Sequence, residues 1–457
     1  MPLMSPTDSM FLIGESREQP MHVGSLQVFE LPDGADAGLL RETLQDMLQQ
    51  TDVAPLFRRR PYRSIGTLGQ WGWTDDADVD LEHHVRHSAL PQPGRVRELL
   101  ALVSRLHSTL LDRHRPLWEV HLIEGLEGNR FAVYSKLHHA VMDGVSGMRL
   151  LQRALSATPD EDQPAFWTMR PRRSSSARNR GNPLLRLPRA TIEAVADMAQ
   201  LTPRLLRVAE QAVRAQAATL PGQAPRSMLN VQITGSRRYA AQSYSLERMK
   251  LVAKGAGVTV NDVLLAMSAG ALRDYLLERE ALPSSPLVAM TPVSLRQESA
   301  DGDESTGNAV GAILASLATN ETDPARRLEK IAESTRRAKD VLRGLSQLQA
   351  TALSAGVMLP MAVNSLTGMY RVGTLPFNIV VSNVPGPGDS LYLHGARLSG
   401  LYPLSIPLNG QAMNVTATSY TDDMGIGLTA CRRSVPSVQR MLGGLDRALD
   451  QLVDVVT

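Results

Sequence analysis

The chain has 457 residues, of which 43 % are hydrophobic and 21 % are charged, a composition typical of a soluble globular protein with room for two domains. A formal net charge of +2 gives no reason to expect nucleic-acid binding. The single cysteine, Cys431, excludes a disulfide framework and a cysteine-rich zinc or iron–sulfur site within one chain, and we expect it to be a small core residue.

Nothing at the start of the sequence has the basic region and apolar run of a signal peptide. The longest uncharged stretches, residues 344–370 and 398–421, are interrupted by polar residues or proline and do not resemble the ~20 apolar residues of a membrane span. We therefore expect a cytoplasmic protein, with peripheral attachment to the inner membrane or to lipid inclusions left open.

The N-terminal part alternates strand and helix patterns, and we assign residues 1–160 to a first domain. Strands are expected at 22–31, 118–124 and 130–137, the last two paired across the turn 125–129. Amphipathic helices are expected at 36–50, 96–111 and 145–155.

Residues 161–225 are expected to form a linker and connecting helices. From Arg170 to Arg189 there are seven arginines and no acidic residue, which is typical of a solvated linker. The same arginines could contact anionic lipid head groups or the phosphates of coenzyme A. A helix or helix pair is expected from 190 to 220.

Residues 226–457 repeat the mixed pattern and are assigned to a second domain. Helices are expected at 260–278 and from Asp323-Pro324 onward, where aspartate caps a helix that begins with proline. Strands are expected at 287–295, 308–317 and 377–382, with a hairpin of 413–420 and 425–431.

The most informative segment is Lys136-Leu-His-His-Ala-Val-Met-Asp-Gly144, between an expected strand and an expected helix. An imidazole is the natural general base near neutral pH, so His138 and His139 are catalytic candidates. Asp143 could hold the loop, and Gly144 could permit a tight turn without a side-chain clash. The alternatives are a polar strand end or half of a metal site, but no further ligands stand at zinc-binding spacing, so we expect no metal.

Other catalytic signatures are missing from the sequence. It contains no GxSxG motif for a serine nucleophile, and neither a P-loop nor GxGxxG to cradle phosphates. A serine hydrolase therefore has no obvious nucleophile here, and nucleotide hydrolysis and hydride transfer lack the backbone that would bind their phosphates.

Several segments resemble one family. HHAVMDG matches the HHxxxDG signature of CoA-dependent acyltransferases with the chloramphenicol acetyltransferase-like fold. Arg115-Pro-Leu-Trp-Glu119, Val260-Asn-Asp-Val263 and the segment from Val381 to Pro387 resemble motifs of the bacterial wax ester synthase/diacylglycerol acyltransferase family, as does the segment from Ser5 to Phe11. The matches run in the family's order from residue 5 to about 430.

The resemblance implies an α/β fold of two chloramphenicol acetyltransferase-like domains with mixed sheets, joined by a linker, with a tunnel at their interface. It implies transfer of a fatty acyl group from acyl-CoA to a long-chain alcohol or diacylglycerol, without a cofactor. The uncharged stretch 344–370 could line the tunnel, or it could be ordinary core. The rival functions are acylation of another hydroxyl or amine on the same fold, and a non-catalytic lipid-droplet protein.

The resemblance also assigns roles to individual residues. His139 would be the general base, with His138 in support; Asp143 would be architectural and paired with an arginine, for which Arg296 is the candidate. Asn261 would help shape the site near the developing oxyanion. Structural support or substrate contact is expected from a further set: Pro116, Leu117, Trp118, Asp262, Ser382 and Asn383.

Overall fold

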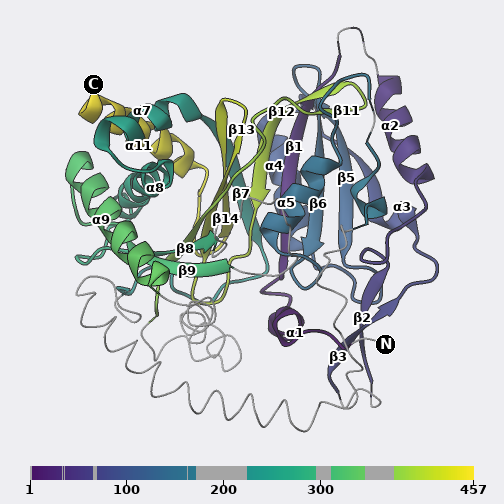
Figure 1. Cartoon of the computed structure of the whole chain (residues 1–457), viewed down its shortest axis with the longest axis horizontal. Helices are drawn as coiled ribbons and strands as arrows, with labels where there is room; N and C mark the ends of the chain where they lie inside the picture. Colours follow the sequence, from purple (N-terminus) through teal and green to yellow (C-terminus); the bar gives the residue numbers. More distant parts are fainter. Residues whose placement is uncertain are drawn as a thin grey trace.

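The computed structural model describes residues 3–32, 34, 37–64, 69–161, 163–170, 224–294, 310–344 and 375–457. Two sheets stand side by side, each with helices packed on it, and the C-terminus lies on the helices of the second half (Figure 1). The expected mixed α/β architecture of two halves is confirmed.

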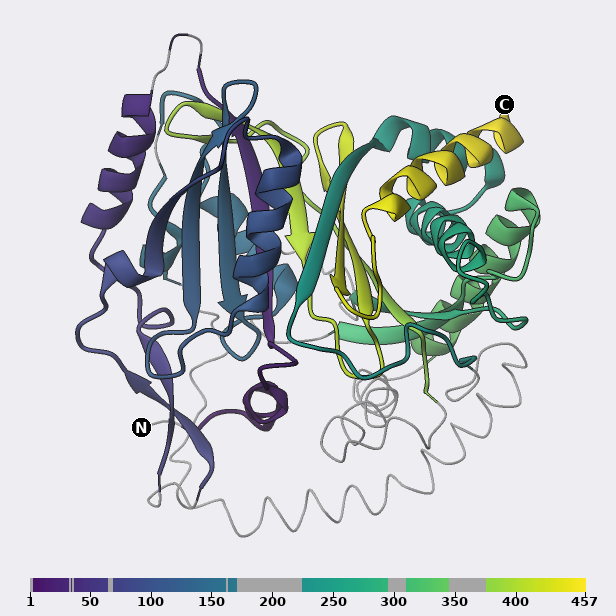
Figure 2. The ribbon, with the colours of Figure 1, turned by 180° about the vertical axis from the view of Figure 1, so that it is seen from behind.

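The first sheet carries the histidine motif. Among the described residues its strand order is β11 (Tyr392–Leu393), β12 (Ala396–Leu404), β1 (His22–Glu30), β6 (Arg130–His138), β5 (Trp118–Leu126) and β4 (Val85–Ala89). The β4–β5 pair is parallel and the other pairs are antiparallel, so the sheet is mixed. Helix α5 (Gly144–Arg153) covers one face and α4 (Val96–Ser108) the other, as the two opposite views show (Figures 1 and 2).

The second sheet has the order β7 (Arg237–Ser245), β14 (Asp423–Cys431), β13 (Met413–Tyr420), β10 (Ile379–Val384), β8 (Val288–Ser294) and β9 (Val310–Ser316) within the described ranges. It is also mixed, because β10 runs parallel to both β13 and β8. Four helices pack on it: α7 (Leu246–Ala256), α8 (Val260–Leu277), α9 (Pro324–Arg343) and α11 (Arg440–Val456).

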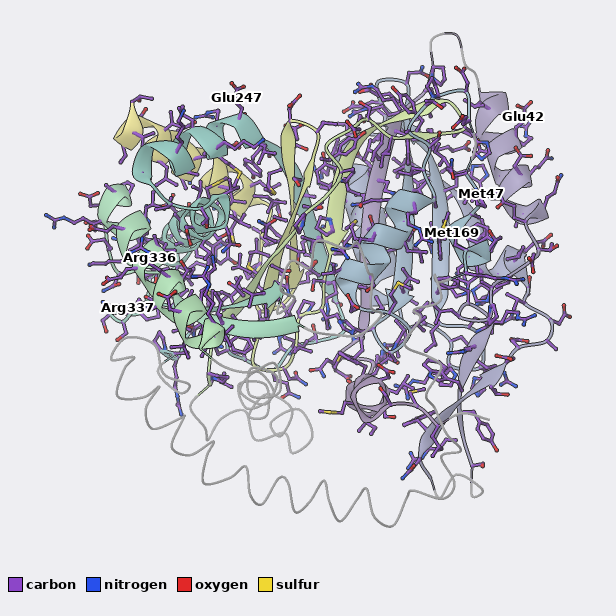
Figure 3. The ribbon with its side chains drawn as sticks, viewed as in Figure 1. Glu42, Met47, Met169, Glu247, Arg336 and Arg337 are labelled. Atoms are coloured by element: carbon purple, nitrogen blue, oxygen red, sulfur yellow. The ribbon has the colours of Figure 1, made fainter. Side chains whose placement is uncertain are left out.

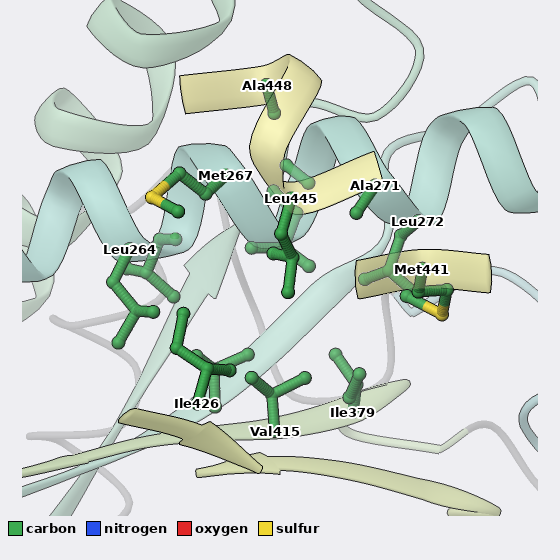
Figure 4. Close-up of a cluster of buried hydrophobic side chains, with 14 of the residues drawn as sticks. Leu264, Met267, Ala271, Leu272, Ile379, Val415, Ile426, Met441, Leu445 and Ala448 are labelled. Atoms are coloured by element: carbon green, nitrogen blue, oxygen red, sulfur yellow. The ribbon is translucent and has the colours of Figure 1, made fainter. Parts of the chain in front are cut away.

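Helix α8 forms the centre of the second core. It lies between the sheet, which contributes Ile379, Val415 and Ile426, and α11, which contributes Met441 and Leu445 (Figure 4). The two helices approach closely because α8 has a glycine at position 270, where an added Cβ would stand 2.8 Å from Ala448 Cβ. No single helix in the described part is long and apolar enough to cross a membrane; α7 and α8 together meet that test by length and composition, but they bend by 104°.

The C-terminal half contributes two strands to the first sheet. Strands β11 and β12 belong to the C-terminal part of the chain, yet β12 pairs with β1 of the first sheet from Gly24 to Glu30. The expected second domain, 226–457, therefore does not coincide with the second sheet, because the open edge of β1 takes its partner from this segment. The chain limits 1–160, 161–225 and 226–457 stay predictions, and most of the linker lies outside the described residues.

The joint between the sheets is close-packed. On β14, a Cβ at Gly425 would stand 2.0 Å from Leu401 O, and one at Gly427 would stand 2.1 Å from Pro403 O, both on β12. On the other side of the joint, Ser104 and Ser108 of α4 accept the backbone N–H groups of β7 at Tyr239 and Arg237. The position of one sheet is thus tied to the other through backbone contacts.

Most expected elements are confirmed, with ends that differ by at most three residues: β1, β5, β6, α2 (Ala37–Gln49), α4 and α5 in the first half, and α8, β8, β9, α9, β10, β13 and β14 in the second. Cys431 is buried at the end of β14, as expected for a core residue. Sequence patterns did not indicate α1 (Pro6–Gly14), the hairpin of β2 (Arg59–Arg63) and β3 (Trp71–Asp75), α3 (Leu81–His84), β7, α7, β12 or α11. The helix expected at 190–220 and the uncharged stretch from 345 to 370 lie outside the described residues.

Candidate active site

The two histidines stand where β6 ends. His138 is the last residue of that strand, and its N–H donates to Leu117 O at 3.0 Å. His139 follows, and its N–H donates to Met21 O at 2.9 Å, in the segment that leads into β1. The backbone of both histidines is therefore fixed by the starts of the two neighbouring strands.

The imidazole of His139 is half-buried beneath α1. It stacks on the ring of Phe11, with centroids 4.0 Å apart and an interplanar angle of 21°. Its Nδ1 is buried and has no hydrogen-bond partner among the described residues. Burial lowers the pKa of His139 to about 4, against an opposing contribution from the charge of Asp143. The ring is therefore neutral near pH 7 and has an unprotonated nitrogen.

Asp143 caps helix α5. One carboxylate oxygen accepts the N–H groups of Val145 and Ser146 at 3.0 and 2.9 Å, and the other accepts the Ser146 hydroxyl at 2.8 Å. These contacts are with the first turn of the helix itself, and the architectural role expected for Asp143 stays a prediction. Arg296 lies outside the described residues, so its pairing with Asp143 stays a prediction.

The reason expected for Gly144 is wrong in this structure. Gly144 is the first residue of α5 and does not have the positive φ of a tight glycine turn. A Cβ built there would come no closer than 3.9 Å to Val23 Cγ1, an ordinary contact. Neither backbone conformation nor crowding by the described residues requires glycine at this position.

A carboxylate that the sequence patterns did not single out completes the surroundings of the histidines. Glu15 follows α1, and its fully buried side chain places Oε1 3.3 Å from His138 Nε2 and Oε2 2.9 Å from Arg113 Nη2. In the sequence it is one acidic residue in a short segment with no periodic pattern. Its one signal is that it closely follows the Ser5 to Phe11 segment that resembles the family.

The Pro116-Leu117-Trp118 segment supports the strand that carries the motif. Leu117 is buried and its carbonyl accepts from His138, while Trp118 begins β5. The indole N–H of Trp118 donates to Phe57 O at 2.9 Å, and its ring stacks on His84 with centroids 4.4 Å apart. The expected structural role of this segment agrees with its contacts.

Asp262 has a structural role at the start of α8. Its Oδ2 accepts the Thr259 N–H and hydroxyl at 3.0 and 2.7 Å, forming a capping box, and its Oδ1 accepts the Thr335 hydroxyl of α9 at 2.6 Å. Asn261 precedes it, half-buried in the same first turn. Helix α8 packs with α7, α9 and α11 in the second half (Figure 1), and the described contacts do not join Asn261 to the histidines.

Ser382 and Asn383 are half-buried residues of β10, in the middle of the second sheet. They pair in register with Thr416 and Ala417 of β13. The described contacts do not join them to His139, and their substrate-binding role stays a prediction.

Two cavities lined by described residues lie away from His139. One lies between the first sheet and helices α2 and α5, where Gln27, Met47 and Leu151 line it; the other is a groove beside α9, lined by Leu328, Glu333 and Arg336 (Figure 3 labels Met47 and Arg336). The expected tunnel between the domains stays a prediction. The described part of the chain contains no group of three or more His, Cys, Asp or Glu side chains placed to hold a metal ion.

Comparisons with known proteins agree with the motifs. Residues 4–264 match the model of the wax ester synthase/diacylglycerol acyltransferase catalytic domain, and residues 306–453 match that of the WS/DGAT C-terminal domain. A Mycobacterium tuberculosis protein assigned as a diacylglycerol O-acyltransferase is 52 % identical over 98 % of this chain and 99 % of its own length.

Solved structures place the fold in the same group. The wax ester synthase/diacylglycerol acyltransferase of Marinobacter aquaeolei is 42 % identical and superimposes with a TM-score of 0.80, with both chains fully covered. The first condensation domain of the CDA synthetase has a TM-score of 0.61 at 14 % identity, covering 99 % of this chain and 96 % of its own, and shares the fold. The chain belongs to the wax ester synthase/diacylglycerol acyltransferase family.

Proposed function

We propose that the protein transfers a fatty acyl group from acyl-CoA to the hydroxyl of diacylglycerol or a long-chain alcohol, with His139 as the general base. Membership of the family makes it an acyl-CoA-dependent O-acyltransferase. The single observation that supports the base assignment is the neutral, half-buried imidazole of His139 at the end of β6, with a buried nitrogen that has no described partner.

The chemistry needs one proton acceptor. An unprotonated nitrogen of His139 takes the proton of the acceptor hydroxyl while that oxygen attacks the thioester carbonyl carbon. The tetrahedral intermediate then collapses, the carbon–sulfur bond breaks, and the imidazolium returns the proton to the sulfur of coenzyme A. One ester and one free thiol form, without an acyl-enzyme.

Fatty substrates gain free energy from burial of their chains, at roughly 0.8 kcal/mol per methylene. A relative with 52 % identity is assigned as a diacylglycerol O-acyltransferase, which favours diacylglycerol as the acceptor. A long-chain alcohol is the second acceptor of the same proposal, since the Marinobacter aquaeolei structure carries both activities in its name. Enzyme and acceptor would meet at a membrane or lipid-inclusion surface.

The test is an assay of thiol release. Purified protein is given palmitoyl-CoA with diacylglycerol, hexadecanol or a long-chain amine, and the products are separated by chromatography. We expect ester with the first two acceptors. Amide as the main product would instead support the rival acyltransferase chemistry, and lipid binding without thiol release would support the non-catalytic lipid-droplet protein.

The base assignment is tested with His139→Ala. We expect turnover to fall by about 10²–10⁴-fold with an unchanged circular dichroism spectrum, because the substrate hydroxyl loses its proton acceptor. His114→Ala is the matched control, since His114 is 92 % exposed and pairs with Asp112 at the surface. Near-normal turnover of folded His139→Ala would refute the assignment.

A further inference from the structure

The Glu15 side chain is surrounded by hydrogen-bond donors. Its Oε2 accepts Nε and Nη2 of Arg113 at 3.0 and 2.9 Å, and its Oε1 accepts the Met21 N–H at 3.1 Å and faces His138 Nε2 at 3.3 Å. No part of the side chain is exposed. A buried carboxylate is costly unless its oxygens are occupied in this way, so the site is built around the charge.

Glu15 stays ionised. Burial acts to raise the pKa of its carboxyl, but His138, the Met21 N–H and Arg113 together hold that pKa below its ordinary value. The guanidinium of Arg113 also donates to Leu12 O at 2.9 Å, which ties the charge pair to the end of α1.

The contacts of His138 assign its tautomer. The Ala140 N–H donates to Nδ1 at 3.1 Å, so that nitrogen carries no proton. The ring proton then sits on Nε2, which is the nitrogen that faces Glu15 Oε1. Nε2 makes no hydrogen bond to a described residue, so Glu15 acts on it through its charge at 3.3 Å, and that charge favours the tautomer with the proton on Nε2.

A second route leads from the same oxygen to His139. Met21 donates its N–H to Glu15 Oε1, and the Met21 carbonyl accepts the N–H of His139 at 2.9 Å. Phe11, in the helix that ends just before Glu15, stacks on the His139 ring. The side chain of one histidine and the backbone of the other thus depend on one residue.

We propose that Glu15 is a positioning residue for acyl transfer: its carboxylate orients the His138 ring directly and the His139 backbone through Met21. The inference rests on the proposed role of His139. Glu15 does not touch the reacting atoms; it holds the base where the acceptor hydroxyl must arrive.

The variant that tests this is Glu15→Gln. The carboxamide has nearly the same size, but its NH₂ group must face the donors of Arg113 or those of Met21 and His138, where it finds no acceptor. Glu18→Gln is the matched control, because it removes a carboxylate from the same loop, where residue 18 is exposed.

We expect kcat of Glu15→Gln to fall by about 10- to 100-fold with KM for acyl-CoA within about twofold, since misplacing a base by a fraction of an ångström affects the chemical step more than binding. The pH–rate profile should keep its shape, and Glu18→Gln should match the wild type. A folded Glu15→Gln with wild-type kcat, or with a change in KM alone, would overturn the proposal.

A measurement on the unaltered protein keeps the test decisive if Glu15→Gln does not fold. In ¹⁵N-histidine-labelled protein, the signal that disappears in His138→Gln should have the proton on Nε2; a proton on Nδ1 would overturn the proposal. The His139→Ala result separates the two hypotheses. If His139→Ala keeps its turnover, the base assignment fails. If His139→Ala loses turnover while Glu15→Gln has the wild-type kcat, the base assignment stands and the positioning role of Glu15 is rejected.

Discussion

The carboxylate of Asp143 caps helix α5, and its charge acts to raise the pKa of His139. Two substitutions separate these effects. Asp143→Ala removes the acceptor for the N–H groups of Val145 and Ser146 and for the Ser146 hydroxyl. Loss of an N-cap costs about 1 kcal/mol, and loss of a negative charge at a helix N-terminus costs about 0.3–1 kcal/mol more. We expect the free energy of unfolding to fall by about 1–2 kcal/mol.

Asp143→Asn keeps an oxygen that can cap the helix and removes only the charge. Asparagine and aspartate cap helices about equally well, so we expect the free energy of unfolding to fall by about 0.3–1 kcal/mol, the contribution of the charge alone. Both variants should lower kcat, because the charge of Asp143 opposes the effect of burial on the pKa of His139, and without it the ring is a weaker base.

The assays are urea unfolding followed by circular dichroism and initial rates of thiol release from acyl-CoA. Asp143→Ala should lose more activity than Asp143→Asn, since it also loosens the loop between His139 and α5. Equal destabilisation by the two substitutions would refute the capping argument. Such a result would favour pairing of the charge with an arginine, and Arg296→Gln should then reproduce it.

Two further outcomes follow from the structure. Because burial lowers the pKa of His139 from 6.5 to about 4, its ring stays neutral as the pH falls through 6.5, and we expect the acid limb of kcat/KM near pH 4; a limb near 6.5 in folded protein would contradict the burial of the base. Gly427→Ala should lower the free energy of unfolding by more than about 2 kcal/mol in urea, because its Cβ would stand 2.1 Å from the Pro403 carbonyl between the two sheets. Gly443→Ala on α11, with nothing closer than Arg447 Nη1 at 3.6 Å, should instead stabilise by about 0.5–1 kcal/mol; a loss in this control equal to that of Gly427→Ala would remove the steric explanation.

The local elements and the histidine motif could be predicted from the sequence because their causes lie within a few residues. The amphipathic pattern of α4 and the Asp-Pro start of α9 are each complete within one segment. Asp143 caps the helix that begins at the next residue, so this contact also follows from nearby sequence. The motif HHAVMDG is contiguous, so its match to the HHxxxDG signature of CoA-dependent acyltransferases is complete within seven residues of sequence.

Only the tertiary structure decided which distant segments complete these elements. Glu15 and His138 are far apart in the sequence but lie in contact, and β12, from the second half of the chain, pairs with β1. Neither contact can be predicted from nearby residues, because the sequence around a single acidic residue or a strand does not identify the segment against which it packs. The low pKa of His139 is likewise a consequence of burial, which depends on the packing of α1 and Phe11 rather than on the neighbours of His139 in sequence. The residues of the motif were determined locally, whereas their orientation and charge were determined by segments folded against them.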